Sequence, residues 1–256
     1  MNKSPLYVIF DFDWSLINEN SDTWVVQTLA PDLYTELSEL ARNDESGFKN
    51  QWTKLMDHIV GRMMTERGVS IGSLNEALRN IPIFKEIVTA IKLVHMSGAR
   101  LAILSDANMH YISVILDHLG IADCFSDIVS NKAEIESPTQ STQTLRIFPY
   151  QNATSPHRCA LCPSNLCKGG VLDSWRATVS ENTGNSAAHR VVYIGDGRGD
   201  FCPSLRLATT DIVLCREGWA LHNAIQQSSS VCAQVIPWST GGDVLRVLEL
   251  ILQDSI

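Results

Sequence analysis

The feature that most constrains the fold is an apolar run near the start of the chain that ends in two carboxylates. Val8-Ile9-Phe10 is followed by Asp11, and a second acid, Asp13, comes two residues later. A short apolar run of this kind is typical of a buried strand in a parallel sheet. Ligands bind at the carboxyl edge of such sheets, and buried acids there need a cation to neutralise them. The pattern therefore predicts an α/β fold with a cation site at this edge.

Other apolar runs alternate with stretches of helical spacing along the rest of the chain. We expect strands over 101–104, 127–130, 191–194 and 212–214, and helices within 23–80 and over 84–96, 111–119 and 244–252. Strands that alternate with helices indicate a mainly parallel, doubly wound sheet. Because no strand signal interrupts the helical stretch, we predict two domains. They are residues 1–18 and 86–256, which carry the expected strands, and a helical insert of residues 19–85. Residues 131–170 are polar, and we expect them to be irregular.

The composition favours a small molecule as the partner. The 256 residues are 45% hydrophobic and 19% charged, which fits a globular protein of one large domain or of a domain with an insert. A net charge of -8 without a basic run argues against nucleic acid. No run approaches the roughly 18 apolar residues of a membrane span, and the first residues lack a signal-peptide pattern. We therefore expect a cytoplasmic protein without a membrane partner, whose oligomeric state the sequence does not predict.

Polar side chains follow three of the expected strands. They are Asp11 and Asp13, Ser105 and Asp106, and Asp196 and Asp200. One Asp at a strand end is as easily the N-cap of the next helix. Since the carboxyl ends of parallel strands meet at one edge, however, three such ends together indicate a site. Carboxylate oxygens are the ligands that Mg²⁺ prefers.

These residues have the parts needed for phosphoryl transfer. One carboxylate of the Asp11/Asp13 pair can attack phosphorus, and the other can protonate the leaving oxygen and then activate water. Ser105 is suited to hold a phosphoryl oxygen. Lys168, between a cysteine and two glycines, is the candidate cation, although a single Lys is more often a solvated surface charge.

A protein of a different class, a phosphoaccepting signalling domain, also uses an Asp, a Mg²⁺ ion and a Lys on a parallel sheet. Asp13 favours an enzyme, because an acid two residues after the nucleophile can supply and remove protons. The length of the chain and the helical stretch also exceed what a signalling domain needs.

The motifs resemble those of the haloacid dehalogenase superfamily in type and order. They are Asp11-Phe12-Asp13-Trp14-Ser15, Ser105, Lys168 and the segment 195–200. The longer strings at 19–22, 104–108, 162–169 and 195–203 resemble the phosphoethanolamine/phosphocholine phosphatase family. That family includes plant relatives that act on thiamine phosphate, and others that act on pyridoxal phosphate or pyrophosphate. The resemblance covers nearly the whole chain and implies a Rossmann-like core with a helical cap between the first and second motifs.

The resemblance also implies how the carboxylates divide their work. Asp11 would be the nucleophile and Asp13 the general acid and base. Mg²⁺ would be held by Asp11, by the main-chain carbonyl of Asp13 and by Asp196, with Asp200 supporting the waters on the metal.

Four other residues would contact the substrate. Ser105 and Lys168 would grip the phosphate, and Asp22 and Asp106 would bind the rest of the molecule. Extra acids beside a phosphate site favour a substrate with a cationic tail. The predicted substrate is thus phosphoethanolamine, phosphocholine, thiamine monophosphate or pyridoxal phosphate. Hydrolysis of inorganic pyrophosphate on the same scaffold remains the alternative.

Two features have no place in this scheme. His157, Cys159, Cys162 and Cys167 lie within eleven residues and offer enough soft ligands for a tetrahedral zinc site. Because a structural metal site usually has two well separated ligand pairs, a set of reduced thiols that pack a loop beside Lys168 fits these residues better. Trp14, between two polar residues of the first motif, has no role that the sequence explains.

Overall fold

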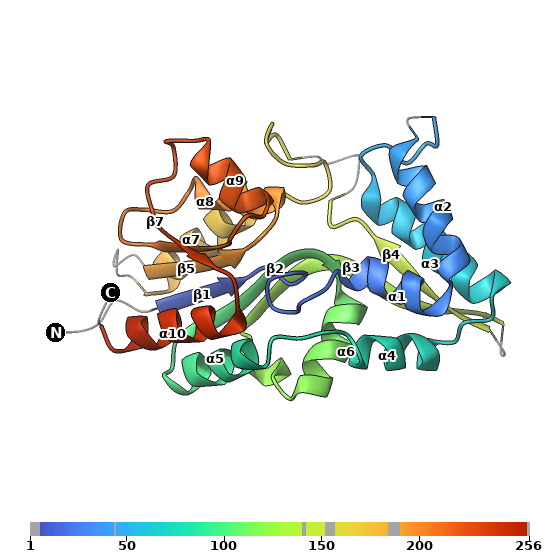
Figure 1. The fold of residues 1–256 in the computed structure, drawn as a ribbon, viewed down its shortest axis with the longest axis horizontal. Coiled ribbons are helices and arrows are strands. Elements are labelled where there is room, and N and C mark those ends of the chain that lie inside the picture. Colours follow the sequence, from blue (N-terminus) through green and yellow to red (C-terminus); the bar gives the residue numbers. More distant parts are fainter. Residues whose placement is uncertain (1–5, 44, 140–141, 152–156, 184–189, 255–256) are drawn as a thin grey trace.

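The structure, a computed structural model, is built on a seven-stranded sheet (Figure 1). It describes residues 6–43, 45–139, 142–151, 157–183 and 190–254. The strands are β1 (Leu6–Phe10), β2 (Arg100–Asn108), β3 (Asp127–Thr139), β4 (Thr142–Phe148), β5 (Arg190–Gly195), β6 (Ile212–Arg216) and β7 (Gln234–Trp238). Their order in the sheet is β4-β3-β2-β1-β5-β6-β7, and all neighbours are parallel except β3 and β4.

Helices cover both faces of this sheet. They are α1 (Ser21–Leu29), α2 (Pro31–Arg42), α3 (Trp52–Glu66), α4 (Ile71–Arg79), α5 (Lys85–Met96), α6 (Met109–Leu119), α7 (Lys168–Thr183), α8 (Phe201–Ser204), α9 (Ala220–Gln226) and α10 (Gly241–Leu252). Figure 1 shows α7, α8 and α9 on one side and α5, α6 and α10 on the other. The predicted doubly wound α/β fold is confirmed. Among the described residues, no helix has both the length and the apolar character needed to cross a membrane.

The first strand is buried on both faces, which explains its unbroken apolar sequence. Val8 and Phe10 belong to the larger apolar cluster, whereas Tyr7 and Ile9 belong to the smaller one on the opposite face. The strand lies between β2 and β5, with Phe10 paired to Ile103 and to Ile194 of these neighbours. The ends of β1, β2 and β5 therefore meet at one edge.

The stretch expected to be helical contains four helices, α1 to α4, which lie beyond the carboxyl edge of the sheet (Figure 1). The chain enters and leaves this stretch at one place. Ile17 forms an isolated antiparallel bridge with Ile83, and the Asn18 N–H donates to the Pro82 carbonyl at 2.9 Å. Apolar residues of these helices share the larger cluster with the sheet. The division into a core and a cap of residues 19–85 thus remains a proposal.

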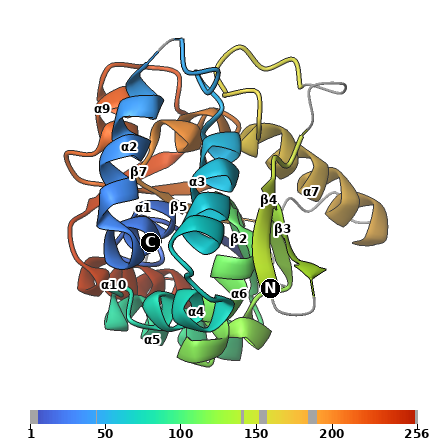
Figure 2. The same ribbon diagram turned by 90° about the vertical axis from the view of Figure 1, so that its right-hand side faces the viewer.

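Residues 131–139 and 142–148, expected to be irregular, instead form most of the two paired strands β3 and β4, called the β3–β4 hairpin. Figure 2 shows this hairpin beside α3. Asp57 of α3 accepts from the Ile147 N–H at 2.8 Å and from the Arg146 guanidinium at 2.9 and 3.0 Å. Leu145 and Ile147 of β4 are buried, whereas Arg146 between them is not. The hairpin is stabilised by a helix that is distant in the sequence, which is why local sequence patterns do not indicate it.

Candidate active site

Three carboxylates converge at the carboxyl edge of the sheet. Asp11 follows β1, Asp196 follows β5, and Asp200 ends the short turn after β5. One oxygen of each lies within 4.8 Å of the others, and all three side chains are buried. The structure therefore brings together three of the four acids expected around a metal.

Hydrogen bonds hold these carboxylates in place. The Asp11 N–H donates to the Ile194 carbonyl at 2.8 Å, which continues the pairing of β1 with β5. Ser15 Oγ donates to Asp196 Oδ1 at 3.1 Å. Asp200 Oδ2 accepts from the N–H groups of Asp196 and Gly197 at 3.2 and 2.9 Å.

Lys168, at the start of α7, reaches into the same cluster. Its Nζ lies 2.8 Å from Asp11 Oδ1 and 2.8 Å from Asp200 Oδ1, and the residue is only 4% exposed. The Tyr193 hydroxyl donates to the same oxygen of Asp200 at 2.7 Å. Burial lowers the pKa of Lys168, but the charges of Asp11 and Asp200 outweigh it and raise that pKa well above its usual value. The alternative of a solvated surface charge is thus wrong for this lysine.

The cluster holds more negative than positive charge. Burial and the charge of Asp200 raise the pKa of Asp11 well above its usual value, although Lys168 opposes this. The same two causes raise the pKa of Asp196 to about 7. Three buried carboxylates facing one ammonium favour an additional cation. Because the donors are all oxygens, they fit Mg²⁺ rather than a thiophilic ion.

The carboxylate of Asp13 points away from this cluster, toward the start of α1. Its oxygens accept from the Ser21 N–H at 3.0 Å and from Asn20 Nδ2 at 3.1 Å. Asn20 is also the N-cap of α1 and accepts from the Thr23 N–H, so the helix begins beside Asp13. Burial and the nearby charge of Asp22 raise the pKa of Asp13 well above its usual value. This carboxyl is thus able to keep a proton at a pH where an ordinary Asp has none.

Two predicted substrate residues, Asp22 and Asp106, lie close enough to Asp13 to raise its pKa. Asp22 is buried in α1, and its Oδ2 accepts from Trp52 Nε1 at 2.7 Å. Burial raises the pKa of Asp22 to about 7, against the hydrogen bond from Trp52, and the charge of Asp106 adds to the rise. Asp106 is exposed, yet its charge raises the pKa values of Asp11 and Asp13 as well. Both acids therefore act electrostatically on the site.

Ser105 is buried beside Asp106 within β2, a strand that extends four residues beyond its predicted end. Its Oγ accepts from the Ala107 N–H at 3.1 Å. The pairing of β2 with β3 shifts register between Leu104 and Asn108, which is where these side chains lie. Such irregularities re-aim side chains at the end of a strand.

Three polar atoms near Asp13 and Asp22 are buried without a hydrogen-bond partner among the described residues. They are Ser21 Oγ, Asn108 Nδ2 and the Tyr111 hydroxyl. Charges on Asp22 and Asp13 raise the pKa of Tyr111, after the larger effect of burial, so this ring lies close to both acids. Unpaired buried polar atoms are costly in a folded protein and are explained when a ligand supplies the missing partners.

Trp14 has a structural role that the sequence did not reveal. Its φ of 57° is left-handed, and its carbonyl accepts from Arg216 NH1 at 2.8 Å. The Arg216 guanidinium lies 4.3 Å from the centre of the Trp219 ring and 5.6 Å from that of Trp14, and Arg216 NH2 donates to Asn18 at 2.8 Å. A left-handed conformation costs about 1–2 kcal/mol for a residue other than Gly, and these contacts offset it. Arg216 thus fixes the loop after Asp13, and sequence patterns gave no signal for it.

The chain is similar to known phosphatases over nearly its whole length. A family model described as Putative Phosphatase matches residues 6–252. The thiamine phosphate phosphatase-like protein of Arabidopsis thaliana is 38% identical over 247 residues, which are 96% of this chain and 94% of that one. Inorganic pyrophosphatase 2 of the same plant is 34% identical over 252 residues, 97% of this chain and 84% of that one.

Among solved structures, that of a substrate-bound phosphoserine phosphatase complex has the same fold. It superimposes with a TM-score of 0.60 at 14% identity and covers 96% of this chain and 99% of that one. The family model and the relatives together define a phosphatase, and its fold is that of the phosphoserine phosphatase structure. More narrowly, the chain belongs to the Putative Phosphatase family, and the resemblance noted from its motifs is confirmed.

Proposed function

We propose that the protein is a Mg²⁺-dependent phosphatase that hydrolyses a small cytoplasmic phosphate monoester through a phosphoaspartate at Asp11. The observation that carries this proposal is the convergence of Asp11, Asp196 and Asp200 around Lys168 Nζ. The carboxylates of Asp11 and Asp196 and the main-chain carbonyl of Asp13 would hold the ion, and Asp200 would hold its waters. Bound Mg²⁺ would supply positive charge to the phosphoryl oxygens during transfer.

Asp11 and Asp13 would perform the two chemical steps. A carboxylate oxygen of Asp11 forms a bond to phosphorus, while the bond to the leaving oxygen breaks and Asp13 gives that oxygen its proton. In the second step Asp13 takes a proton from water, and the water oxygen displaces Asp11 from phosphorus. The raised pKa of Asp13 supports this role, because a general acid has to carry its proton near the working pH.

Ser105 and Lys168 would grip the phosphoryl group while it is transferred. Lys168 already contacts Asp11, so its ammonium lies where charge would develop on the phosphoryl oxygens. We propose that residues 19–85 act as a cap over this group. Asp22 of α1 and Trp52 of α3 are hydrogen-bonded to each other, so two helices of this stretch already meet beside Asp13. Covering the site would exclude water from a small substrate.

The surroundings of Asp13 favour a substrate with an amine or another cationic tail. Asp22 and Asp106 place acidic side chains beside the phosphate site, and the unpaired atoms of Ser21, Asn108 and Tyr111 offer further polar contacts. A cation beside Asp22 would stabilise its charged form and compensate its burial. Phosphoethanolamine, phosphocholine, thiamine monophosphate and pyridoxal phosphate fit this description.

Pyrophosphate is the second candidate. It rests on the 34% identity to a protein named Inorganic pyrophosphatase 2. The acids at Asp22 and Asp106 count against it, because they would repel a second phosphate unless a metal covered it. Membership of a phosphatase family decides against a phosphoaccepting signalling domain.

The test is phosphate release from this panel of substrates, with Mg²⁺ and after its removal, by wild type and Asp22→Asn. We expect activity only with Mg²⁺. We expect the substitution to raise KM for phosphocholine and phosphoethanolamine about tenfold, an effect that corresponds to about 1.4 kcal/mol. An ester without a cationic group should lose less.

Glu39→Gln is the matched control, because Glu39 is an exposed acid of α2 in the same helical stretch. It should leave every KM unchanged. Equal losses with cationic and uncharged esters in Asp22→Asn would show that Asp22 only maintains structure. A strong preference of the wild type for pyrophosphate would contradict the cationic tail.

A further inference from the structure

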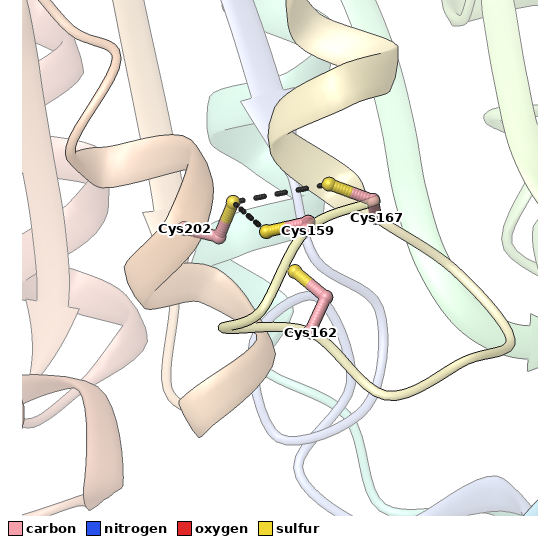
Figure 3. A group of neighbouring side chains, drawn as sticks. All are labelled: Cys159, Cys162, Cys167 and Cys202. Carbon is pink, nitrogen blue, oxygen red and sulfur yellow. Dashed lines mark hydrogen bonds between the residues drawn. The ribbon is translucent and has the colours of Figure 1, made fainter. Parts of the chain in front are cut away.

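Four cysteine side chains meet beside the carboxylates without taking part in the proposed reaction. Figure 3 shows the sulfurs of Cys159, Cys162, Cys167 and Cys202 turned toward one another. One atom of each lies within 4.8 Å of the others. Cys159 and Cys162 come from the loop before α7, Cys167 immediately precedes that helix, and Cys202 belongs to α8.

The spacing of the sulfurs matches a shared metal ion. Cys202 Sγ is 3.6 Å from Cys159 Sγ and 3.9 Å from Cys167 Sγ. A tetrahedral zinc ion with Zn–S bonds of about 2.3 Å places its sulfurs about 3.8 Å apart. A disulfide would bring two of them to about 2.05 Å, whereas all of these cysteines are free.

The ligand set differs from the one that the sequence suggested. His157 does not face the sulfurs, because its Nε2 lies 2.7 Å from the Pro163 carbonyl and its Nδ1 accepts from the Cys159 N–H. Cys202 takes the place expected for His157. It comes from a separate segment, so the ligands are not confined to eleven neighbouring residues and can close around an ion.

Groups around the sulfurs suit negatively charged thiolates. The Gly170 N–H donates to Cys167 Sγ at 3.3 Å, and Arg206 NH2 lies 4.0 Å from Cys202 Sγ. Four thiolates and one Zn²⁺ carry a net charge of −2, which an arginine partly compensates. The approach of α7 to α8 also depends on Gly169, because a Cβ atom there would lie 2.6 Å from Cys202 Sγ.

We propose that Cys159, Cys162, Cys167 and Cys202 bind a structural Zn²⁺ ion. The four thiols lose their protons as four Zn–S bonds form, and no electron transfer is involved. The protein supplies all four ligands, so no position is left for substrate. Because Cys167 precedes Lys168 and Cys202 follows Asp200 by two residues, the ion would fix the segments that carry this buried ion pair.

The first experiment measures zinc in protein purified without chelator or added thiol. We expect about one Zn²⁺ per chain in wild type, and a zinc content at least tenfold lower in Cys162→Ser. Cys232→Ser is the matched control, because Cys232 is exposed and lies outside the cluster, and it should keep the full zinc content. After replacement by Co²⁺, the wild type should show the absorption of tetrahedral cobalt thiolate.

A second experiment uses wild type only, so that it holds even if Cys162→Ser does not fold. The thiols of native protein are titrated with a coloured thiol reagent before and after a strong zinc chelator. We expect four thiols to become reactive together with the release of one Zn²⁺. If the protein contains no zinc after incubation with Zn²⁺, the proposal is overturned. This holds both when the four thiols are free and when mass spectrometry shows a disulfide between two of them. Neither readout depends on phosphatase activity, so the failure of one proposal is distinguishable from that of the other.

Discussion

The two clusters at the end of this sheet lie side by side but differ in chemistry. The oxygen cluster consists of Asp11, Asp196 and Asp200 with Lys168, and the sulfur cluster consists of four cysteines. Both use the start of α7 and the segment from β5 to α8, since Lys168 follows Cys167 directly. The oxygen cluster contains its own ammonium, whereas in the sulfur cluster the four sulfurs face one another. The same backbone segments thus present a group of hard oxygen ligands and a group of soft sulfur ligands.

The largest effect is expected from the oxygen cluster. Asp11→Asn removes the attacking oxygen while it keeps the size of the side chain, so phosphate release should fall about 10³-fold or more. The zinc content should remain that of wild type, because the sulfurs are untouched. Phosphate release and zinc are measured on the same preparation.

Asp123→Asn is the control for this substitution, because Asp123 is an exposed acid far along the chain from the cluster. It should leave kcat unchanged. If Asp11→Asn released phosphate at the wild-type rate, Asp11 would not be the nucleophile.

A smaller effect is expected where the two clusters share a helix. In Gly169→Ala the new methyl group would lie 2.4 Å from Arg206 Nε and 2.6 Å from Cys202 Sγ, so these two side chains or the start of α7 would have to shift. We expect a loss of about 1–3 kcal/mol in the free energy of unfolding. The displacement of Lys168 should lower kcat about tenfold to hundredfold. Urea unfolding and steady-state kinetics measure the two losses.

Gly170→Ala is a close control, because its methyl group would meet Cys167 Sγ at an ordinary 3.5 Å. It should be neutral or stabilise the helix by up to about 1 kcal/mol. If the two variants had the same free energy of unfolding and the same kcat, the packing around Gly169 would not be tight. A change beside the sulfur cluster would then not be transmitted to Lys168.

The smallest effect concerns pH and should have opposite signs for Asp22, which lies near Asp13, and for the sulfur cluster. Asp22 has a pKa of about 7 in the folded protein against 3.8 for an ordinary Asp, so the folded state binds this proton more tightly. Its contribution to stability is complete below the unfolded pKa and is lost as the pH rises toward 7. Between pH 5 and 7 we expect titration of Asp22 to lower the free energy of unfolding of the metal-free, substrate-free protein by about 1–2 kcal/mol. Zinc binding should strengthen over the same range, because thiols must lose protons to bind the ion.

Asp22→Asn isolates the first of these contributions, since its amide does not titrate. Urea unfolding at pH 5 and pH 7 should show that the free energy of unfolding falls less between these pH values in this variant than in wild type. An identical loss in both proteins would mean that Asp22 does not titrate in this range.

The oxygen cluster was largely predictable from the sequence. Asp11, Ser105 and Asp196 each follow a run of apolar residues, and the parallel sheet brings such ends together. Lys168 was predicted from the two glycines that follow it and from the resemblance of its motif, although its helix lacks a regular apolar stripe. The roles proposed for these side chains stay predictions.

Other parts depend on contacts that no local pattern shows. Arg216 is the last residue of β6, and its importance comes from Trp14, about two hundred residues earlier in the chain. Cys202 lies among residues that resemble the fourth motif, and no spacing pattern groups it with Cys159. The β3–β4 hairpin is fixed by Asp57 of α3, again across a long separation.

The bridge between Ile17 and Ile83 has a consequence for how such chains diversify. The chain leaves the sheet at Ile17 and returns to it at Ile83, and these two residues are paired. The stretch between them is therefore an insertion whose two ends lie side by side. A very short linker could join these two ends directly. A longer or shorter insertion would change the entropic cost of closing the loop only slightly. The sheet can therefore keep its acids while the intervening stretch changes in length or sequence, so related chains can differ there without altering the edge that carries Asp11 and Asp196.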